Sequence, residues 1–328
     1  MGFAEIATRH GSGFGSIPGV GSAPLIDRGR ILARRGARFA YRAVGRRQTG
    51  VALMPAPRLD AKVLEDCGQP VIVASHRRSG THLTIDLLRR QFRECGAWKW
   101  PGEGLDALYT NLDRLGWHPD PLTPARFASL LARAEHPLLK THATPDLGEL
   151  RDVQGPWVDQ LLQRARIIYV VRDGRAVMVS AQRHEARLGL DVGRDVLDYM
   201  RLETDGRSRV RAWADHVEQW LGVAGVLLLR YEDVVHRGAD VVARLGDFLG
   251  LEPCWMQPIA PPLVRNAWQK RAMRFTHLRP PTTALTPPTA PRDWQELFGP
   301  EEEAFFDAEA GGLMRKLGYP NESRDFDE

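Results

Sequence analysis

Short apolar runs recur along this chain and alternate with stretches in which apolar residues repeat at helical spacing. The runs at residues 71–73, 136–140, 166–171 and 226–230 predict buried strands. The helical stretches are residues 83–91, 127–134, 156–164, 174–187, 209–221, 239–249 and 300–317. Repeated alternation of this kind is typical of an α/β protein. We therefore expect a central parallel sheet flanked by helices on both faces.

The first strand leads through a compact loop, residues 76–82, into a helix. That arrangement points free backbone N–H groups and the positive end of a helix dipole at an anion. Gly80 permits close approach of the backbone, Ser79 and Thr81 offer hydroxyl groups, and Arg78 adds a positive fork. The loop is not a Walker A motif, because it has one glycine and no lysine. It predicts a phosphate site, with an ordinary basic turn as the alternative.

Chemistry-bearing residues also follow the later strands. Lys140 and His142 are two residues apart at the end of the second predicted strand, so their side chains should point the same way. A neutral imidazole can accept a proton from a hydroxyl, and a nearby ammonium can stabilise developing negative charge. An ordinary strand end is the alternative for this pair.

Arg172 ends the next strand, and Ser180 lies two turns into the helix after it. Together these two residues could grip a second phosphate. A structural bridge from Arg172 to Asp173 or Glu185 is the alternative. Tyr231 follows the last predicted strand, where its ring could stack on a purine or simply mark a strand exit.

Trp213, Val217 and Trp220 fall on one face of the helix at residues 209–221. Aromatic and aliphatic residues at this spacing indicate core packing better than they indicate a cofactor site. We therefore expect that helix to serve the core.

The charge of the chain is unevenly distributed. Residues 1–50 contain nine arginines and two acidic residues, a net charge of +7, which leaves −3 for the remainder of a chain whose total is +4. The body is slightly acidic, so nucleic acid is not an expected partner. The three cysteines have no metal-ligand spacing, and we expect no metal. With no apolar stretch of membrane-spanning length, a cytoplasmic location is the expectation.

Composition divides the chain in two. Residues 1–64 predict a basic, Gly- and Arg-rich extension that is partly disordered, and residues 65–328 predict the folded domain. We favour the interpretation that this extension is a solvated segment preceding the domain. The alternatives are weak contact with an anionic membrane surface, contact with a partner, and a transit peptide. The proline-heavy residues 258–291 predict a long loop of the kind that often forms a lid.

Taken together, these segments resemble the sulfotransferases that use 3′-phosphoadenosine 5′-phosphosulfate (PAPS), most closely the cytosolic type. The family's phosphosulfate loop, Pro-Lys-Ser-Gly-Thr-Thr-Trp, corresponds to residues 77–83, and its Lys-Thr-His corresponds to residues 140–142. Its 3′-phosphate segment, Arg-Asp-Pro-Arg-Asp-x-x-x-Ser, corresponds to residues 172–180. Its Trp-x-x-His-Val-x-x-Trp and Leu-x-Tyr-Glu-Asp motifs correspond to residues 213–220 and 229–233.

Three features depart from the family's pattern. The lysine of the phosphosulfate loop is Arg78, as in the tyrosylprotein sulfotransferases, and the tryptophan of the loop is Leu83. The family's Arg-Lys-Gly before Gly-Asp-Trp is not visible before Asp293-Trp294, where Arg279 or Arg292 could substitute. The sequence predicts no particular oligomeric state.

The resemblance implies a sulfotransferase fold similar to that of P-loop kinases. It also implies transfer of a sulfuryl group from PAPS to a hydroxyl or amine of a small-molecule or glycan acceptor. His142 would be the general base, with Lys140 and Arg78 stabilising charge. The nucleotide would be held by residues of the loop and of later strand ends: Arg78, Ser79, Gly80, Thr81, His82, Arg172, Ser180 and Tyr231. The alternatives are a nucleotide-dependent phosphotransferase, a catalytically silent nucleotide-binding protein and a membrane-surface adaptor.

Overall fold

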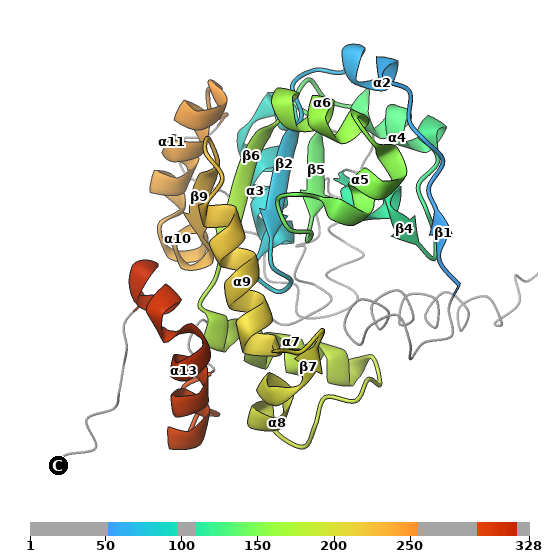
Figure 1. Ribbon diagram of the computed structural model, residues 1–328. Coiled ribbons are helices and arrows are strands. Elements are labelled where there is room, and N and C mark those ends of the chain that lie inside the picture. Colours follow the sequence, from blue (N-terminus) through green and yellow to red (C-terminus); the bar gives the residue numbers. More distant parts are fainter. Residues whose placement is uncertain (1–51, 97–108, 255–293, 320–328) are drawn as a thin grey trace, which may run out of the picture.

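The computed structural model describes residues 52–96, 109–254 and 294–319 (Figure 1). Its centre is a five-stranded sheet in the order β3-β5-β2-β6-β9, and all four neighbouring pairs are parallel. The strands are β2 (Val71–Ser75), β3 (Thr110–Asn111), β5 (Leu138–Thr141), β6 (Arg166–Val171) and β9 (Leu227–Arg230). The expected parallel α/β sheet is therefore confirmed. β2 is the first strand of this sheet in the sequence, and later strands lie on both of its sides, β5 on one and β6 on the other. Ligands of open α/β sheets bind at such a change of direction in strand order.

The sheet is buried on both faces because side chains alternate along each strand. Val71 and Val73 of β2 pack into one core, whereas Ile72 and Ala74 pack into the other. In β6, Tyr169 and Val171 lie on the same side as Ile72. A strand buried on both faces must be apolar at every position, which accounts for the uninterrupted apolar runs in the sequence.

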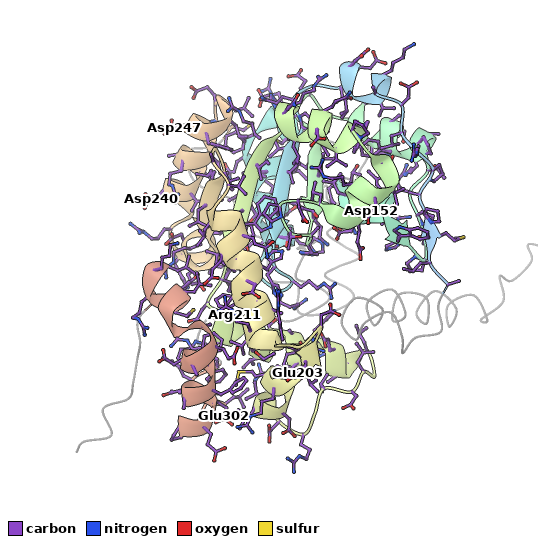
Figure 2. The ribbon with its side chains drawn as sticks, in the orientation of Figure 1. Asp152, Glu203, Arg211, Asp240, Asp247 and Glu302 are labelled. Atoms are coloured by element: carbon purple, nitrogen blue, oxygen red, sulfur yellow. The ribbon has the colours of Figure 1, made fainter. Side chains whose placement is uncertain are left out.

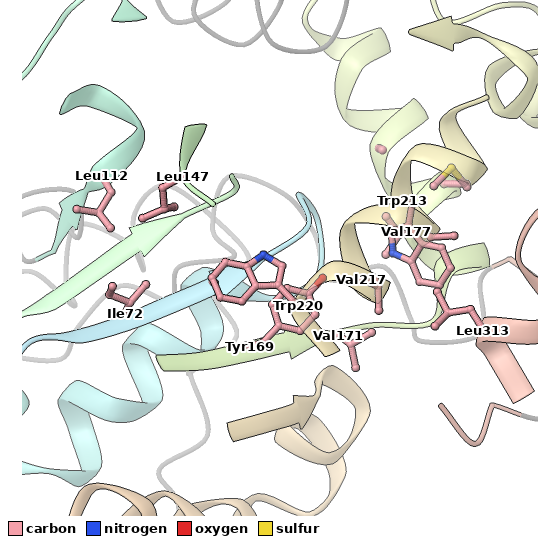
Figure 3. Packing of buried hydrophobic residues seen from close by; sticks show 14 of the residues in the cluster. Ile72, Leu112, Leu147, Tyr169, Val171, Val177, Trp213, Val217, Trp220 and Leu313 are labelled. Atoms are coloured by element: carbon pink, nitrogen blue, oxygen red, sulfur yellow. The ribbon is translucent and has the colours of Figure 1, made fainter. Parts of the chain in front are cut away.

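Helices form a layer on each face. The core around Val71 and Val73 is covered by α3 (Thr81–Gln91), α10 (Tyr231–His236) and α11 (Gly238–Leu249). The opposite core is covered by a larger set: α4 (Pro124–Leu131), α5 (Gly148–Gln154), α6 (Trp157–Arg164), α7 (Gly174–Arg187), α8 (Val196–Arg201), α9 (Arg209–Leu221) and α13 (Pro300–Lys316). Trp220 stacks on Tyr169 at 5.5 Å between ring centroids (Figure 3).

The outer faces of these helices are polar. Figure 2 shows Asp240 and Asp247 of α11 pointing away from the sheet, and both residues are exposed. Within the described ranges, no group of three or more His, Cys, Asp or Glu side chains could hold a metal ion. None of the helices described is both long and apolar enough to cross a membrane.

Several short elements lack a clear periodic pattern and were not predicted. They are α2 (Lys62–Glu65), β1 (Met54–Pro55), β4 (Trp117–His118), β7 (Glu203–Thr204), β8 (Arg207–Ser208), η1 (Arg93–Cys95) and η3 (Leu112–Leu115), together with β3, α5, α8 and α10. β1 pairs with β4, and Leu64 is buried, so residues 54–64 already contact the domain. The expected boundary near residue 65 otherwise stays a prediction.

Other expectations lie outside the described residues. These are the basic stretch at 26–47 with its membrane or partner contact, the proline-heavy loop at 258–291, and the two substitutes for the missing Arg-Lys-Gly, Arg279 and Arg292.

Candidate active site

The carboxyl ends of the four longer strands meet at one edge of the sheet. Ser75 of β2 is aligned with Val170 of β6, Ala74 of β2 with Thr141 of β5, and Val171 of β6 with Arg230 of β9. The residue that follows each strand is therefore brought to the same edge: His76, His142, Arg172 and Tyr231. Every predicted strand-end residue lies at this edge.

The loop after β2 has an unusual backbone. Arg78 has a φ of 69° and Gly80 a φ of 99°. The left-handed region costs a non-glycine residue about 1–2 kcal/mol, and such conformations cluster at functional sites. Ser75 Oγ and Thr81 Oγ1 are 2.5 Å apart, which ties the strand end to the first residue of α3. Ser79 Oγ is buried and has no hydrogen-bond partner in the described part of the chain.

Gly80 is required by its neighbours. A Cβ at this position would overlap the ring of Tyr231. The guanidinium of Arg172 lies over that same ring, 4.5 Å from its centroid. The backbone of the loop and the guanidinium of Arg172 thus both contact the Tyr231 ring.

Arg78, Arg172 and Ser180 come together, as the sequence predicted. Arg78 Nε donates to Ser180 Oγ at 3.1 Å, and Arg172 Nη1 donates to the Arg78 carbonyl at 3.1 Å. Burial, together with the positive charges of Arg172 and Arg187, lowers the pKa of Arg78 to about 10. A bound anion would raise the pKa of Arg78 again, because its negative charge would offset the positive charges of the two adjacent guanidinium groups.

The carboxylates considered as structural partners for Arg172 pair with other arginines. Asp173 forms a two-bond ion pair with Arg175, at 3.0 and 2.8 Å. Glu185 lies 3.2 Å from Arg209.

His142 is held in a defined orientation. Its Nδ1 lies 2.8 Å from the Ser75 carbonyl oxygen, which can only accept a hydrogen bond. Nδ1 must therefore carry the proton, and Nε2 of the neutral ring keeps its lone pair. Burial and the positive charge of Lys140 hold the pKa of His142 well below its usual range, so the ring is neutral at pH 7. This is the protonation state that a general base needs.

Asp113 supports the backbone beneath that imidazole. Its Oδ1 accepts from Thr141 Oγ1 at 2.8 Å and from the His142 backbone N–H at 3.2 Å. The sequence analysis did not identify Asp113, which lies 28 residues before Thr141 in a short 3₁₀ turn. No sequence motif connects the two positions.

Lys140 and His82 lie beside a shared tyrosine. His82 Nε2 is 3.0 Å from the Tyr109 hydroxyl, and Lys140 Nζ is 5.8 Å from the centre of the Tyr109 ring. Burial, followed by the charges of Lys140 and Arg78, holds the pKa of His82 well below its usual value. The two predicted cations of the site, Lys140 and Arg78, are thus both near enough to His82 to act on its charge.

This edge of the sheet combines a cationic loop at a helix N-terminus with a neutral, oriented imidazole. That combination on a parallel sheet covered on both faces is typical of α/β proteins that bind phosphorylated ligands. The model of the sulfotransferase domain family matches residues 69–318, most of the chain. The chain therefore belongs to the sulfotransferase family.

Individual relatives are distant. Sulfotransferase 2A2 of Rattus norvegicus is 31% identical over 96 residues, a stretch that covers 27% of this chain and 34% of that protein. The match thus spans about a third of the length of that relative.

Among solved structures, mouse SULT7A1 complexed with PAP is 18% identical with a TM-score of 0.47, covering 76% of this chain and 86% of that one. STF9 of Mycobacterium avium is 15% identical with a TM-score of 0.39, covering 78% of each chain.

Proposed function

We propose that this protein transfers a sulfuryl group from PAPS to a hydroxyl or amine acceptor, with His142 as the general base. The observation that carries the proposal is the double role of Ser75. Its carbonyl accepts from His142 Nδ1 at 2.8 Å, and its hydroxyl is 2.5 Å from Thr81 Oγ1 in the anion loop. One residue thereby fixes both the base and the loop.

The residues present suit a nucleotide that carries two separate phosphate positions. The buried Ser79 hydroxyl lacks a partner among the described residues, and the loop around it leads into the N-terminus of α3. The N-terminus of α3 and Arg78 would hold the 5′-phosphosulfate. Arg172 and Ser180 would hold the 3′-phosphate. The ring of Tyr231 would contribute to binding of the purine. PAPS, when bound, supplies the activated sulfuryl group.

His142 would act on the acceptor. Its Nε2 lone pair takes the proton of the acceptor hydroxyl as the oxygen bonds to sulfur, while the bond from sulfur to the bridging phosphate oxygen breaks. Arg78 and Lys140 are placed to oppose the negative charge that grows on the leaving phosphate and on the transferred group. Most of the rate enhancement would come from positioning and preorganised charge, as in phosphoryl transfer.

Two measurements test the proposal. Isothermal titration of the full chain should detect binding of 3′,5′-diphosphoadenosine (PAP), with weaker binding of 5′-AMP, which lacks the 3′-phosphate. Incubation with ³⁵S-labelled PAPS and a panel of phenols, alcohols, sugars and amines should then label at least one acceptor, and His142→Gln should abolish labelling while PAP still binds.

The alternatives predict different results. Binding of ATP with magnesium, without binding of PAP, would instead favour a phosphotransferase. PAP binding with no labelled acceptor would favour a silent nucleotide-binding protein. Near-normal labelling by His142→Gln would remove His142 from the role of base.

A further inference from the structure

A second histidine lies directly behind the proposed base. His216, in the middle of α9, is 7% exposed. Its Nε2 is 3.2 Å from both the His142 and the Ala143 carbonyl oxygens. Trp220, one turn later on the same helix, donates its Nε1 hydrogen to the Ala143 carbonyl at 3.1 Å. Two side chains of α9 therefore hold the backbone at the point where β5 has already ended.

Hydrogen-bond chemistry fixes the state of the His216 ring. Carbonyl oxygens only accept, so Nε2 carries the proton and donates it toward both carbonyls. On the other side of the ring, Nδ1 lies 3.0 Å from the Tyr169 hydroxyl, which must be the donor if the ring is neutral. Burial lowers the pKa of His216 to about 4, which keeps the ring neutral at pH 7.

Tyr169 is itself fixed. It lies in the central part of β6, is 1% exposed, and stacks on Trp220. It is also aligned with Ala74 of the neighbouring strand β2. A continuous path of contacts thus runs from β2 through Tyr169 and His216 to the carbonyl of His142.

We propose that His216 is a positioning residue for the reaction, and that its donation to the His142 and Ala143 carbonyls keeps the His142 imidazole in the Nδ1–H tautomer facing Ser75. The inference rests on the proposed function, since it assigns His216 to the base of that reaction. Asp113 holds the same backbone from the amide side, at the His142 N–H. Ala143 N–H still donates to Thr141 Oγ1 when His216 is replaced, but the His142 carbonyl loses its donor, which loosens the backbone that orients the ring.

The test uses ¹⁵N-histidine NMR of the full-length chain at pH 7, with the His142 signals assigned by their loss in His142→Gln. The wild-type protein should give the pattern of a neutral Nδ1–H ring at His142. In His216→Asn, whose amide reaches only the position of Nδ1, that pattern should be lost to a mixture of tautomers. In His216→Gln, whose amide nitrogen reaches the position of Nε2, it should be retained.

Two further variants complete the design. Tyr169→Phe keeps the packing but removes the donor to His216 Nδ1, so it should cause a smaller loss of the His142 Nδ1–H pattern. The same variant provides the test if His216→Asn does not fold. His118→Asn is the matched control, because His118 is also 7% exposed but lies in β4 and is bonded to Asp120. It should leave the His142 signals unchanged.

Unchanged His142 signals in both His216→Asn and Tyr169→Phe would overturn the inference. So would equal losses in His216→Asn and His216→Gln, because the position of the donor would then be irrelevant. PAP titration separates this question from the proposed function. A wild-type protein that does not bind PAP argues against the function, whereas the tautomer measurement needs no nucleotide and still decides the role of His216.

Discussion

The hydroxyl of Tyr319 donates to Glu232 Oε2 at 2.8 Å. The other oxygen of that carboxylate accepts from the Asp173 backbone N–H at 3.1 Å. Tyr319 lies just after α13 and just beyond residue 318, where the family match ends. The end of the described chain is thereby bonded, through one carboxylate, to the strand end that carries Arg172. Arg230 lies over the Tyr319 ring at 4.2 Å and secures the same contact.

Tyr319→Phe should weaken both stability and nucleotide binding. The substitution leaves one oxygen of Glu232 without its donor, which should cost about 1–2 kcal/mol of unfolding free energy in urea titrations. Because Asp173 is next to Arg172, affinity for PAP should also fall, by roughly threefold. Tyr199→Phe is the control: it also loses a buried hydroxyl, bonded to Arg209, but should leave PAP affinity unchanged. Equal PAP affinity in the two variants would contradict a link from Tyr319 to the site.

Arg172→Ala should weaken PAP binding by about ten- to a hundredfold, since a charge-assisted hydrogen bond contributes roughly 1.5–3 kcal/mol. Binding of 5′-AMP should change much less, because that nucleotide lacks the phosphate assigned to Arg172. Arg166→Ala is the matched control, since Arg166 is an exposed cation at the opposite end of the same strand. Equal losses for the two nucleotides, measured by titration calorimetry, would remove Arg172 from the 3′-phosphate position.

Gly80→Ala should disturb the loop at residues 76–82 by more than the cost of its backbone conformation alone. The left-handed conformation costs alanine about 1–2 kcal/mol, and the new Cβ would also overlap the Tyr231 ring. Gly189→Ala isolates the first effect, because Gly189 has a φ of 75° and open space around it. We expect both variants to lose stability and only Gly80→Ala to lose PAP binding. PAP binding by Gly80→Ala at the wild-type level would show that the close contact between Gly80 and the Tyr231 ring is not needed for nucleotide binding.

Long elements with a clear period could be predicted from the sequence. The bounds of β6, α7 and α9 are those expected, because each has an unbroken apolar pattern. The grouping of Arg78, Arg172 and Ser180 was also predictable, since strand ends converge in a parallel sheet. The supporting contacts were not. Thr141 to Asp113, Tyr169 to His216 and Tyr319 to Glu232 join residues 28, 47 and 87 positions apart. Such pairs depend on tertiary packing, and no local spacing encodes them.

Acid should destabilise this protein well before its carboxylates titrate. Burial is the leading cause that lowers the pKa of five histidines around the site: His76, His82, His142, His184 and His216. In the unfolded chain each would titrate near its ordinary value of about 6.5. Above that pH neither state is protonated and these groups have no effect on stability. Below it the unfolded state binds protons that the folded state excludes, so unfolding becomes easier as pH falls.

The size of the effect follows from linkage. Each such histidine contributes up to about 1.4 kcal/mol of lost unfolding free energy per pH unit, down to its own folded-state pKa. Urea titrations at pH 7.5, 6.5 and 5.5 should therefore give a modest loss of stability between the first two values and a much larger loss between the second and the third. His216, with a pKa of about 4, contributes across that whole interval. His216→Gln should reduce the loss of stability by about the contribution of one histidine. A stability that is flat or rises toward pH 5.5 would mean that these rings accept protons in the folded state, and the neutral base assigned to His142 would be untenable.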